Sequence, residues 1–396
     1  MELSHYFEPY TGGMQTVPGI NAEEALGCEI SFYKGEAEWF ENFSGRAVII
    51  GVPESRNSVD NRACANAPDA IRPYLYGLSA FNEKGIFGDA GNIRGNGLND
   101  RYQALQEAIV YFNGRGVTVL LLGGTQDLTV PVVKGRLKLH PERPVNIVVG
   151  DAMLDIDTRG EDFSSRSWLS YLIGSHDVRI DDLVVFGTQK YLISPAQEKF
   201  LKERFFEIIR LGELRGENIS QLEIPVRDAQ IVSIDFRMIK GQPQFTSDIQ
   251  SPHGIEPYDA CRILRYSGMS DQVMAAGIFD VPFEEDRKDT LVLAAEMVWH
   301  FMDGFYGRYS EQPEEDAEMY KKYVVPLDGL DHPLFFFRNT GNDRWWMKAP
   351  MGAVKEVVAC SREDYRQSLR SEIPGKWWRL FMRNRCRDRN DDLDDK

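Results

Sequence analysis

The chain has 396 residues, of which 42% are hydrophobic, so it is long enough to bury a large core in one big domain or two smaller ones. Lysine and arginine number 46 against 61 aspartates and glutamates, which gives a formal net charge of −15. That acidic balance argues against binding to the phosphate backbone of nucleic acid, because such binding rests on lysine and arginine contacts.

The sequence also limits the compartment. The five cysteines form no C-x-x-C pair, and this spacing favours reduced thiols over a zinc site or a disulfide framework. The N-terminus lacks a basic segment followed by an apolar one, and no apolar run reaches the roughly 18 residues that cross a bilayer. We therefore expect no membrane partner and a cytoplasmic location.

Apolar runs alternate with helical patterns after a mixed, aromatic-rich segment at the start of the chain. The predicted strands lie at residues 46–51, 117–122, 145–149, 183–186, 206–211, 231–234 and 273–278. The predicted helices lie at residues 35–43, from Pro68 onward, and at 102–112, 258–267 and 290–305. Residues 85–99 are rich in glycine and asparagine and predict a surface loop. This alternation predicts an α/β fold with three layers (α/β/α), in which helices flank a doubly wound, mostly parallel sheet.

The composition changes after the last of these helices. We predict an N-terminal segment at 1–44, an α/β domain at 45–307, and a C-terminal aromatic extension at 308–396. The extension is expected to pack on the main domain and to end in a disordered acidic tail near 388–396. It contains four tryptophans, Trp345, Trp346, Trp377 and Trp378. They either pack over the main domain or form an interface for assembly, since exposed aromatic patches often mark interfaces.

One strand end carries a cluster of acids. Residues 145–157 read VNIVVGDAMLDID, so Asp151 and Asp155 follow directly after a buried apolar run. Ligands of parallel α/β sheets bind at the carboxyl ends of the strands. The two aspartates are therefore candidates for a cation site, and the alternative is that they cap the next helix.

Three strand-end motifs together resemble those of the ureohydrolase superfamily, which comprises arginases, agmatinases and formimidoylglutamases. That family carries G-G-D-H-S, then D-A-H-x-D, then S-x-D-x-D-x-x-D, each just past a buried strand. This chain has GGTQD at 123–127, DAMLD at 151–155 and SIDFR at 233–237. The resemblance implies the arginase-like α/β fold and, by analogy, a trimer or a hexamer.

Two further segments extend the resemblance over roughly residues 45–307. NRACANAPDAIR at 61–72 is similar to an early segment of the family, and FDVP at 279–282 is similar to its late E-V-N-P segment. The aromatic end of the chain is similar to an extension of formimidoylglutamase-like proteins, which makes that subgroup the nearest relative.

In active relatives, six side chains hold two manganese ions that activate a water for attack on a guanidino or formimino carbon. The retained ligand positions here are Asp151, Asp155 and Asp235. The lost positions are Gln126, Met153 and Arg237. A thioether suits manganese poorly, and a guanidinium cannot coordinate a metal. Arg237 should instead form an ion pair with at least one of the aspartates, because a cation relieves their mutual repulsion.

The resemblance thus leads to two alternatives. The first is a family member that has lost binuclear manganese hydrolysis and serves in binding or assembly, with a homo-oligomer or an unidentified protein as its partner. For this alternative we expect no cofactor, no bound metal and no catalytic residue. The second is a formimidoylglutamase-like hydrolase of linear amidines such as formiminoglutamate, with a reduced metal site and manganese as its cofactor. Whether the protein is an enzyme stays open, and we favour the first alternative.

The resemblance also defines the pocket in either case. Its floor is a vestigial site that consists of Asp151, Asp155, Asp235, Arg237 and Asp280. The candidates on the substrate side are Asn61, Arg62 and His253. His253 is either a substituted ligand or an ordinary loop residue.

Overall fold

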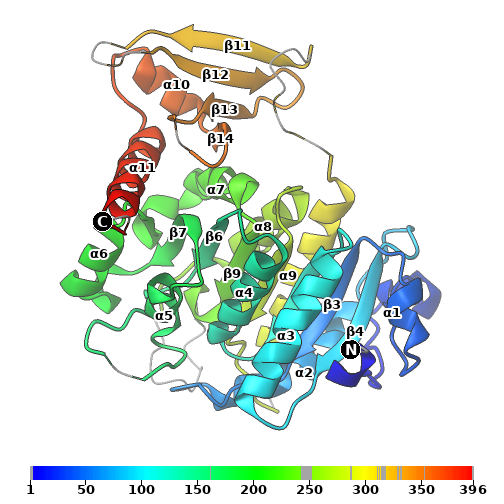
Figure 1. Ribbon diagram of the computed structural model, residues 1–396. Coiled ribbons are helices and arrows are strands. Elements are labelled where there is room, and N and C mark those ends of the chain that lie inside the picture. Colours follow the sequence, from blue (N-terminus) through cyan, green and yellow to red (C-terminus); the bar gives the residue numbers. More distant parts are fainter. Residues whose placement is uncertain are drawn as a thin grey trace.

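The computed structural model describes residues 3–160, 162–241, 252–285, 288–309, 311, 313, 318–327, 330, 332–351 and 353–394, with side chains described up to Cys386. These residues form a large α/β domain and a small antiparallel sheet that lies beside it (Figure 1). Within this described chain, no helix combines the length and the apolar character that a bilayer crossing requires.

The central sheet has ten strands. Nine follow the order β1-β4-β3-β5-β10-β9-β6-β7-β8, and β2 pairs with β4. Only β1 and β4 pair in antiparallel fashion. The bounds are Phe7–Glu8 (β1), Ser31–Phe32 (β2), Ala47–Val52 (β3), Phe87–Ile93 (β4), Thr118–Gly123 (β5), Val145–Gly150 (β6), Ile180–Thr188 (β7), Glu207–Arg210 (β8), Ile231–Asp235 (β9) and Ala275–Phe279 (β10).

Helices cover both faces of this sheet, because its central strands are apolar on both sides. One hydrophobic core takes side chains from α2, α8 and α9, and the other takes them from α3, α4 and α5. The bounds are Glu38–Asn42 (α1), Ala67–Tyr76 (α2), Leu98–Asn113 (α3), Thr129–Leu139 (α4), Trp168–Gly174 (α5), Pro195–Lys202 (α6), Glu223–Asp228 (α7), Pro257–Met269 (α8) and Asp289–Tyr306 (α9). The predicted fold class, a mostly parallel sheet between helical layers, is confirmed.

The predicted loop at 85–99 was wrong, because it contains the fully buried strand β4. The polar residues of this strand are paired inside the fold. Arg72 of α2 donates from Nε to Asp89 Oδ2 at 2.7 Å and from Nη1 to Asn92 Oδ1 at 2.7 Å. Gly91 has a φ of +78°, a conformation that glycine adopts without strain. The strand was missed because a buried arginine, and not an apolar pattern, accounts for its burial.

A four-stranded antiparallel sheet and two helices form the C-terminal extension. The bounds are Tyr320–Val325 (β11), Leu334–Asn339 (β12), Trp345–Lys348 (β13), Val357–Cys360 (β14), Arg362–Ser368 (α10) and Gly375–Asp394 (α11). Figure 1 shows the small sheet above α7, with α11 running from it toward α6. The sheet packs on one face against α11 through Trp377 and Leu380. Its other face meets α7, where the Arg227 guanidinium lies 4.6 Å from the Trp346 ring centre.

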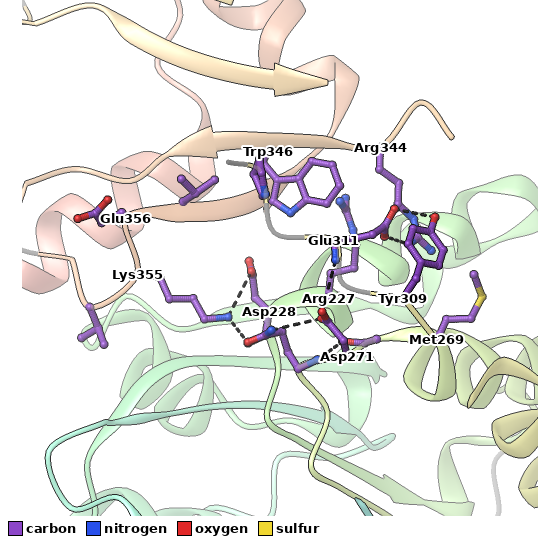
Figure 2. A pocket seen from close by; sticks show the side chains of 15 residues that line it. Arg227, Asp228, Met269, Asp271, Tyr309, Glu311, Arg344, Trp346, Lys355 and Glu356 are labelled. Atoms are coloured by element: carbon purple, nitrogen blue, oxygen red, sulfur yellow. Dashed lines mark hydrogen bonds and ion pairs between the residues drawn. The ribbon is translucent and has the colours of Figure 1, made fainter. Parts of the chain in front are cut away.

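Charged pairs join the extension to the main domain. Lys376 Nζ donates to Asp228 Oδ2 at 2.7 Å, and Arg383 Nη1 donates to Asp182 Oδ1 at 2.7 Å. Lys355 reaches Asp228 from the loop before β14 (Figure 2). Burial would raise the pKa of Asp228, but Lys376, Lys355 and Arg227 outweigh it and hold that pKa below its ordinary value. These pairs therefore contribute stability above the ordinary carboxyl pKa, and this stability is lost in acid.

Three of the four tryptophans of the extension are buried, whereas Trp378 keeps 45% of its surface exposed. The divisions after residues 44 and 307 stay predictions. The acidic tail near 388–396 lies outside the residues whose side chains are described.

Neighbouring tryptophans of α11 provide a matched test of the packing. Trp377 is 8% exposed and Trp378 is 45% exposed. We expect Trp377→Ala to lower the free energy of unfolding by about 3–5 kcal/mol, the usual cost of truncating a buried aromatic, and Trp378→Ala to cost about 1 kcal/mol or less. Denaturant unfolding measures both values. A changed oligomeric mass for Trp378→Ala in light scattering would identify this exposed ring as part of an assembly interface.

Candidate functional site

The site is built from the carboxyl ends of adjacent parallel strands. In the sheet, β9 lies between β10 and β6, and all three run in the same direction. Asp235 ends β9, Asp280 follows β10, and Asp151 follows β6. One carboxylate oxygen from each of Asp151, Asp155 and Asp235 lies within 4.8 Å of the others, and all three residues are buried. The parallel topology therefore forces carboxylates from separate motifs into one cluster.

The guanidinium of Arg237 lies inside this acidic cluster. Its Nε donates to Asp235 Oδ2 at 2.7 Å, and its Nη2 contacts the same oxygen. Nη2 also lies 3.5 Å from Asp155 Oδ2 and 4.0 Å from Asp280 Oδ2. The side chain is 9% exposed. The structure thus places Arg237 where the ion-pair interpretation of the sequence expected it.

A short turn fixes this arrangement. Residues Phe236–Met238 form a 3-10 turn directly after β9. The backbone N–H of Arg237 donates to Asp235 Oδ1 at 2.7 Å, while the guanidinium binds Oδ2 of the same carboxylate. Asp235 therefore holds both the main chain and the side chain of Arg237, so the arginine is oriented before any ligand arrives.

A second arginine, which the sequence reasoning missed, closes the other side of the cluster. Arg166 Nη2 contacts Asp60 Oδ2, and its Nη1 lies 3.7 Å from Asp155 Oδ1 and beside the Met153 sulfur. Asp60 Oδ2 also lies 3.7 Å from Arg237 Nη1. Arg166 and Asp60 come from polar loops without a motif, so nothing in the sequence pattern singled them out.

The two other lost ligand positions are occupied by side chains with different partners. Gln126 is buried, and its Nε2 donates to Ser233 Oγ at 3.1 Å. Its Oε1 has no hydrogen-bond partner in the described part of the chain. Met153 is half-buried beside Arg166. An amide oxygen therefore remains without a partner at the first position, whereas the second offers only a thioether next to a cation.

Burial and mutual repulsion shift the titration of the carboxyl groups. Burial raises the pKa of Asp151 well above its ordinary value, and the nearby Asp155 and Asp235 raise it further. Burial likewise raises the pKa of Asp280, and Arg237 opposes that shift. Burial would lower the pKa of Arg237, but the surrounding aspartates hold it well above the ordinary value. The arginine is thus a permanent cation that offsets part of the repulsion, while the pKa values of Asp151 and Asp280 remain above their ordinary value.

Asp280 adopts an unusual backbone conformation, with a φ of +55°. Its N–H donates to Gly124 O at 2.7 Å, and its Oδ2 accepts from the Gln126 N–H at 2.9 Å. A non-glycine residue in this region costs free energy, and such strain concentrates at functional sites. Asp280 is therefore held firmly toward the cluster.

The substrate-side candidates separate in the structure. Asn61 reaches the cluster, because its Nδ2 donates to the Asp280 carbonyl at 2.9 Å. Arg62 is exposed. His253 is also exposed, lines a different cavity with Lys240 and Gly254, and accepts at its carbonyl from Gln189. The structure brings only Asn61 to the pocket, and the roles of all three residues stay predictions.

Sequence reasoning assigned no role to the polar group around Asp127. The Tyr102 hydroxyl donates to Asp127 Oδ2, and Asn57 Nδ2 lies 3.5 Å from the same atom. Burial raises the pKa of Asp127. Cys64 is buried nearby, and its burial together with Asp280 and Asp127 raises the thiol pKa well above the ordinary value. Cys64 is therefore a protonated thiol and a poor nucleophile.

The three-layer α/β fold and the acidic cluster at its strand ends agree with the resemblance of the sequence motifs to ureohydrolases. The model of the arginase family matches residues 45–303. The chain belongs to the arginase family.

Similar proteins agree with this assignment. A formimidoylglutamase of Staphylococcus epidermidis is 23% identical over 269 residues, which cover 65% of this chain and 83% of that protein. The crystal structure of Trypanosoma cruzi formiminoglutamase with Mn²⁺ has a TM-score of 0.59 and 20% identity, covering 67% of this chain and 97% of that one. The crystal structure of Bacillus subtilis formimidoylglutamase has a TM-score of 0.62 and 17% identity, and the match covers 75% of this chain and 96% of that one. The predicted formimidoylglutamase-like resemblance is confirmed.

The prediction that no cofactor is expected was wrong, because a structural neighbour with this fold contains Mn²⁺ and this chain belongs to its family. The prediction weighed the lost ligand positions and neglected the three carboxylates that remain. Asp151, Asp155 and Asp235 fit one hard divalent cation in distance and in donor type. Asp155 Oδ1 is moreover buried without a hydrogen-bond partner in the described chain. Met153 and Arg237 do not fit a second ion.

Removal of Arg237 tests the electrostatic account. We expect Arg237→Met to lower the free energy of unfolding at pH 7 by about 3–5 kcal/mol, since it leaves buried carboxylates without their cation. The raised carboxyl pKa values mean that the folded protein binds more protons than the unfolded chain, so stability falls as pH rises above the ordinary value of 3.8. Arg237→Met should steepen that fall, and added Mn²⁺ should restore part of the loss. Denaturant unfolding from pH 5 to pH 8 measures both effects.

Arg72→Met is the matched control. Arg72 is also buried and also binds a strand carboxylate, that of Asp89. Its loss should destabilise the fold without any rescue by Mn²⁺, because it leaves only one buried carboxylate, that of Asp89, while the other partner, Asp69, is 60% exposed. Equal rescue of both variants, or an Arg237→Met protein as stable as the wild type at pH 8, would contradict the account.

Proposed function

We propose that this arginase-family protein has lost the binuclear hydrolysis of its relatives and keeps the fold for binding or assembly. The observation that supports the proposal is the contact of Arg237 with Asp235 and its approach to Asp155 and Asp280. A two-metal site uses one ion on each side of the attacking water. A guanidinium is held within this cluster, and it can neither coordinate a water as a Lewis acid nor lower the pKa of that water as a metal does.

The proposal leaves room for a single divalent ion. Asp151, Asp155 and Asp235 are the residues that would hold it, and when bound it would polarise a water molecule. Arg237 competes with such an ion for Asp235, because its Nε already donates to that carboxylate. The occupancy of the cluster is then a balance between a tethered cation and a free one.

A second candidate function follows from the same three carboxylates. With one ion in place, the protein would be a hydrolase of linear amidines such as formiminoglutamate, the substrate that the names of its relatives indicate. The buried Asp155 Oδ1, which has no hydrogen-bond partner in the described chain, favours this alternative. Asn61 would then border the substrate, since it reaches the Asp280 carbonyl. A cytoplasmic location and a homo-oligomeric assembly belong to both proposals.

The release of formamide from formiminoglutamate distinguishes the two functions. We expect the full chain to release no more formamide than its Asp151→Asn variant at any Mn²⁺ concentration. Mn²⁺-dependent release by the wild type that Asp151→Asn abolishes would overturn the proposal and establish the hydrolase.

Restoring the ligand positions tests the role of Arg237 directly. The triple variant Gln126→His, Met153→His, Arg237→Asp should bind Mn²⁺ at least about tenfold more tightly than the wild type, as calorimetric titration measures, because it replaces a buried cation with a carboxylate ligand. The matched control is the double variant Gln126→His, Met153→His, which keeps Arg237 and should gain little affinity. Equal affinity of the double and triple variants would show that Arg237 does not limit metal binding.

A further inference from the structure

A second cavity, of about 620 Å³, lies at the opposite edge of the central sheet. Its walls include Thr118 at the start of β5, Asn146 near the start of β6, and residues just before β10. The acidic cluster lies at the other ends of these strands, so the two sites are separate. Val354 and Lys355, from the loop that precedes β14, complete the wall.

This cavity is basic in a strongly acidic protein. Two carboxylates line it, those of Asp181 and Asp271. The cationic side chains that line it are Arg136, Arg143, Arg308 and Lys355, and His140 joins them. An excess of positive charge along a cleft attracts anions, and its low-dielectric walls focus that attraction.

Arg136 is the most unusual member of this lining. It lies in the last turn of α4, and only 7% of its surface is exposed. Its Nε and Nη1 are buried and have no hydrogen-bond partner in the described chain, and no ion pair there involves it. Buried guanidinium groups are almost always paired, because an unpaired buried charge is costly. The helix C-terminus favours a cation, but it supplies no acceptor to these two N–H groups.

The other cations of the cavity do not relieve this charge. Arg308 donates to the carbonyls of Gly268 and Val273 at 2.6 and 3.1 Å and to Thr118 Oγ1 at 2.9 Å, all of them neutral oxygens. Burial lowers the pKa of Arg136, and the nearby Arg143 lowers it further. Burial, Arg136 and Arg143 likewise lower the pKa of His140. The positive groups thus repel one another across the cavity.

The neighbouring cavity between the main domain and the extension shows the contrast (Figure 2). There each arginine has a carboxylate partner: Arg227 lies 3.0 Å from Glu223, and Arg344 lies 2.8 Å from the same residue and also contacts Glu311. Lys355, which borders both cavities, lies 3.6 Å from Asp228. The charges of that neighbouring cavity are satisfied within the chain, whereas the charge of Arg136 is not.

We propose that the cavity around Arg136 binds a hydrogen phosphate group, either inorganic phosphate or the phosphate of a small phosphomonoester. A guanidinium matches a phosphate in charge and in the geometry of its N–H groups. Asn146 contributes a complementary acceptor: its Nδ2 donates to the Asp228 carbonyl at 3.1 Å, which leaves Oδ1 buried without a partner in the described chain. That oxygen accepts from the P–O–H group of inorganic hydrogen phosphate, or of a phosphomonoester bound as its monoanion, and sulfate has no such group at neutral pH.

Calorimetric titration of the full chain in phosphate-free buffer tests the proposal, with inorganic phosphate, glycerol 3-phosphate and sulfate as probes at equal ionic strength. We expect saturable binding of one or both phosphates and binding of sulfate at least about threefold weaker. Tighter binding of glycerol 3-phosphate would identify a phosphomonoester as the ligand, and tighter binding of inorganic phosphate would identify the free ion. Arg136→Met should weaken phosphate binding by about tenfold or more, because it removes the charge-assisted hydrogen bonds.

Lys138→Met is the matched control, since Lys138 lies on the same helix but is half-exposed and pairs with Glu107 at 2.6 Å. It removes the same charge and should leave the affinity for phosphate unchanged. Equal loss in both variants would reduce the effect to general electrostatics and contradict the site. Absence of saturable phosphate binding by the wild type, or sulfate binding as tight as phosphate binding, would also overturn the proposal.

Two further readouts separate a ligand role from a structural one. In phosphate-free buffer, Arg136→Met should melt no lower than the wild type, and only the wild type should gain thermal stability from phosphate. A variant that fails to fold would show that Arg136 stabilises the chain unaided and would contradict the proposal.

Phosphate should also raise the pKa of His140 in proton NMR, since an anion offsets the cations that face it. Arg136 and Arg143 act directly on His140, and the other charged groups that line the cavity with it are Asp181, Asp271, Arg308 and Lys355.

Discussion

Three carboxylates whose oxygens lie within 4.8 Å of one another repel strongly in a buried site. At an effective dielectric constant near 20, two such charges repel by roughly 3 kcal/mol, and a cluster contains several such pairs. The parallel sheet offers no way to spread them, because neighbouring strands end at one edge. The carboxylates at this edge therefore need a nearby cation in order to ionise. That cation is either a bound metal ion or a positively charged side chain.

A guanidinium that belongs to the chain differs from a metal ion in the chemistry that it allows. A metal ion brings open coordination positions, whereas the guanidinium of Arg237 has none: it donates from Nε and Nη2 to Asp235, and only its Nη1 is left without a hydrogen bond in the described chain. Arg166 adds a second positive charge on the far side of the cluster, between Asp60 and Asp155. Two arginines from distant segments thus form an internal ionic network that offsets part of the negative charge of the cluster. The same network leaves an oxygen of Asp155 without a hydrogen bond in the described chain, so it does not satisfy every acceptor of the site.

Much of the fold was predictable because it follows from apolar pattern. Strands such as Ala47–Val52 and Val145–Gly150 are buried on both faces and read as unbroken apolar runs. The strand at Phe87–Ile93 was missed, since its burial depends on Arg72, which lies on a helix earlier in the chain. The same limit applies to the sites. Arg237 was placed correctly from its position in a strand-end motif, whereas Arg166 acts through a contact between loops that no local pattern encodes.

Three buried arginines show how the fold treats internal charge. Arg72 is satisfied by Asp89, Asn92 and a carbonyl oxygen. Arg237 binds the strand-end carboxylates through Nε and Nη2, and its Nη1 lies 3.7 Å from Asp60 without a hydrogen bond in the described chain. Both lie at positions where the chain itself brings carboxylates, which offset the free-energy cost of burying the guanidinium charge. Arg136 is also buried, but two of its nitrogen atoms have no acceptor and no ion pair involves it in the described chain. Since burial without a partner is unfavourable for any of the three, the difference between them is where the counter-charge comes from: within the chain for Arg72 and Arg237, and from outside it for Arg136.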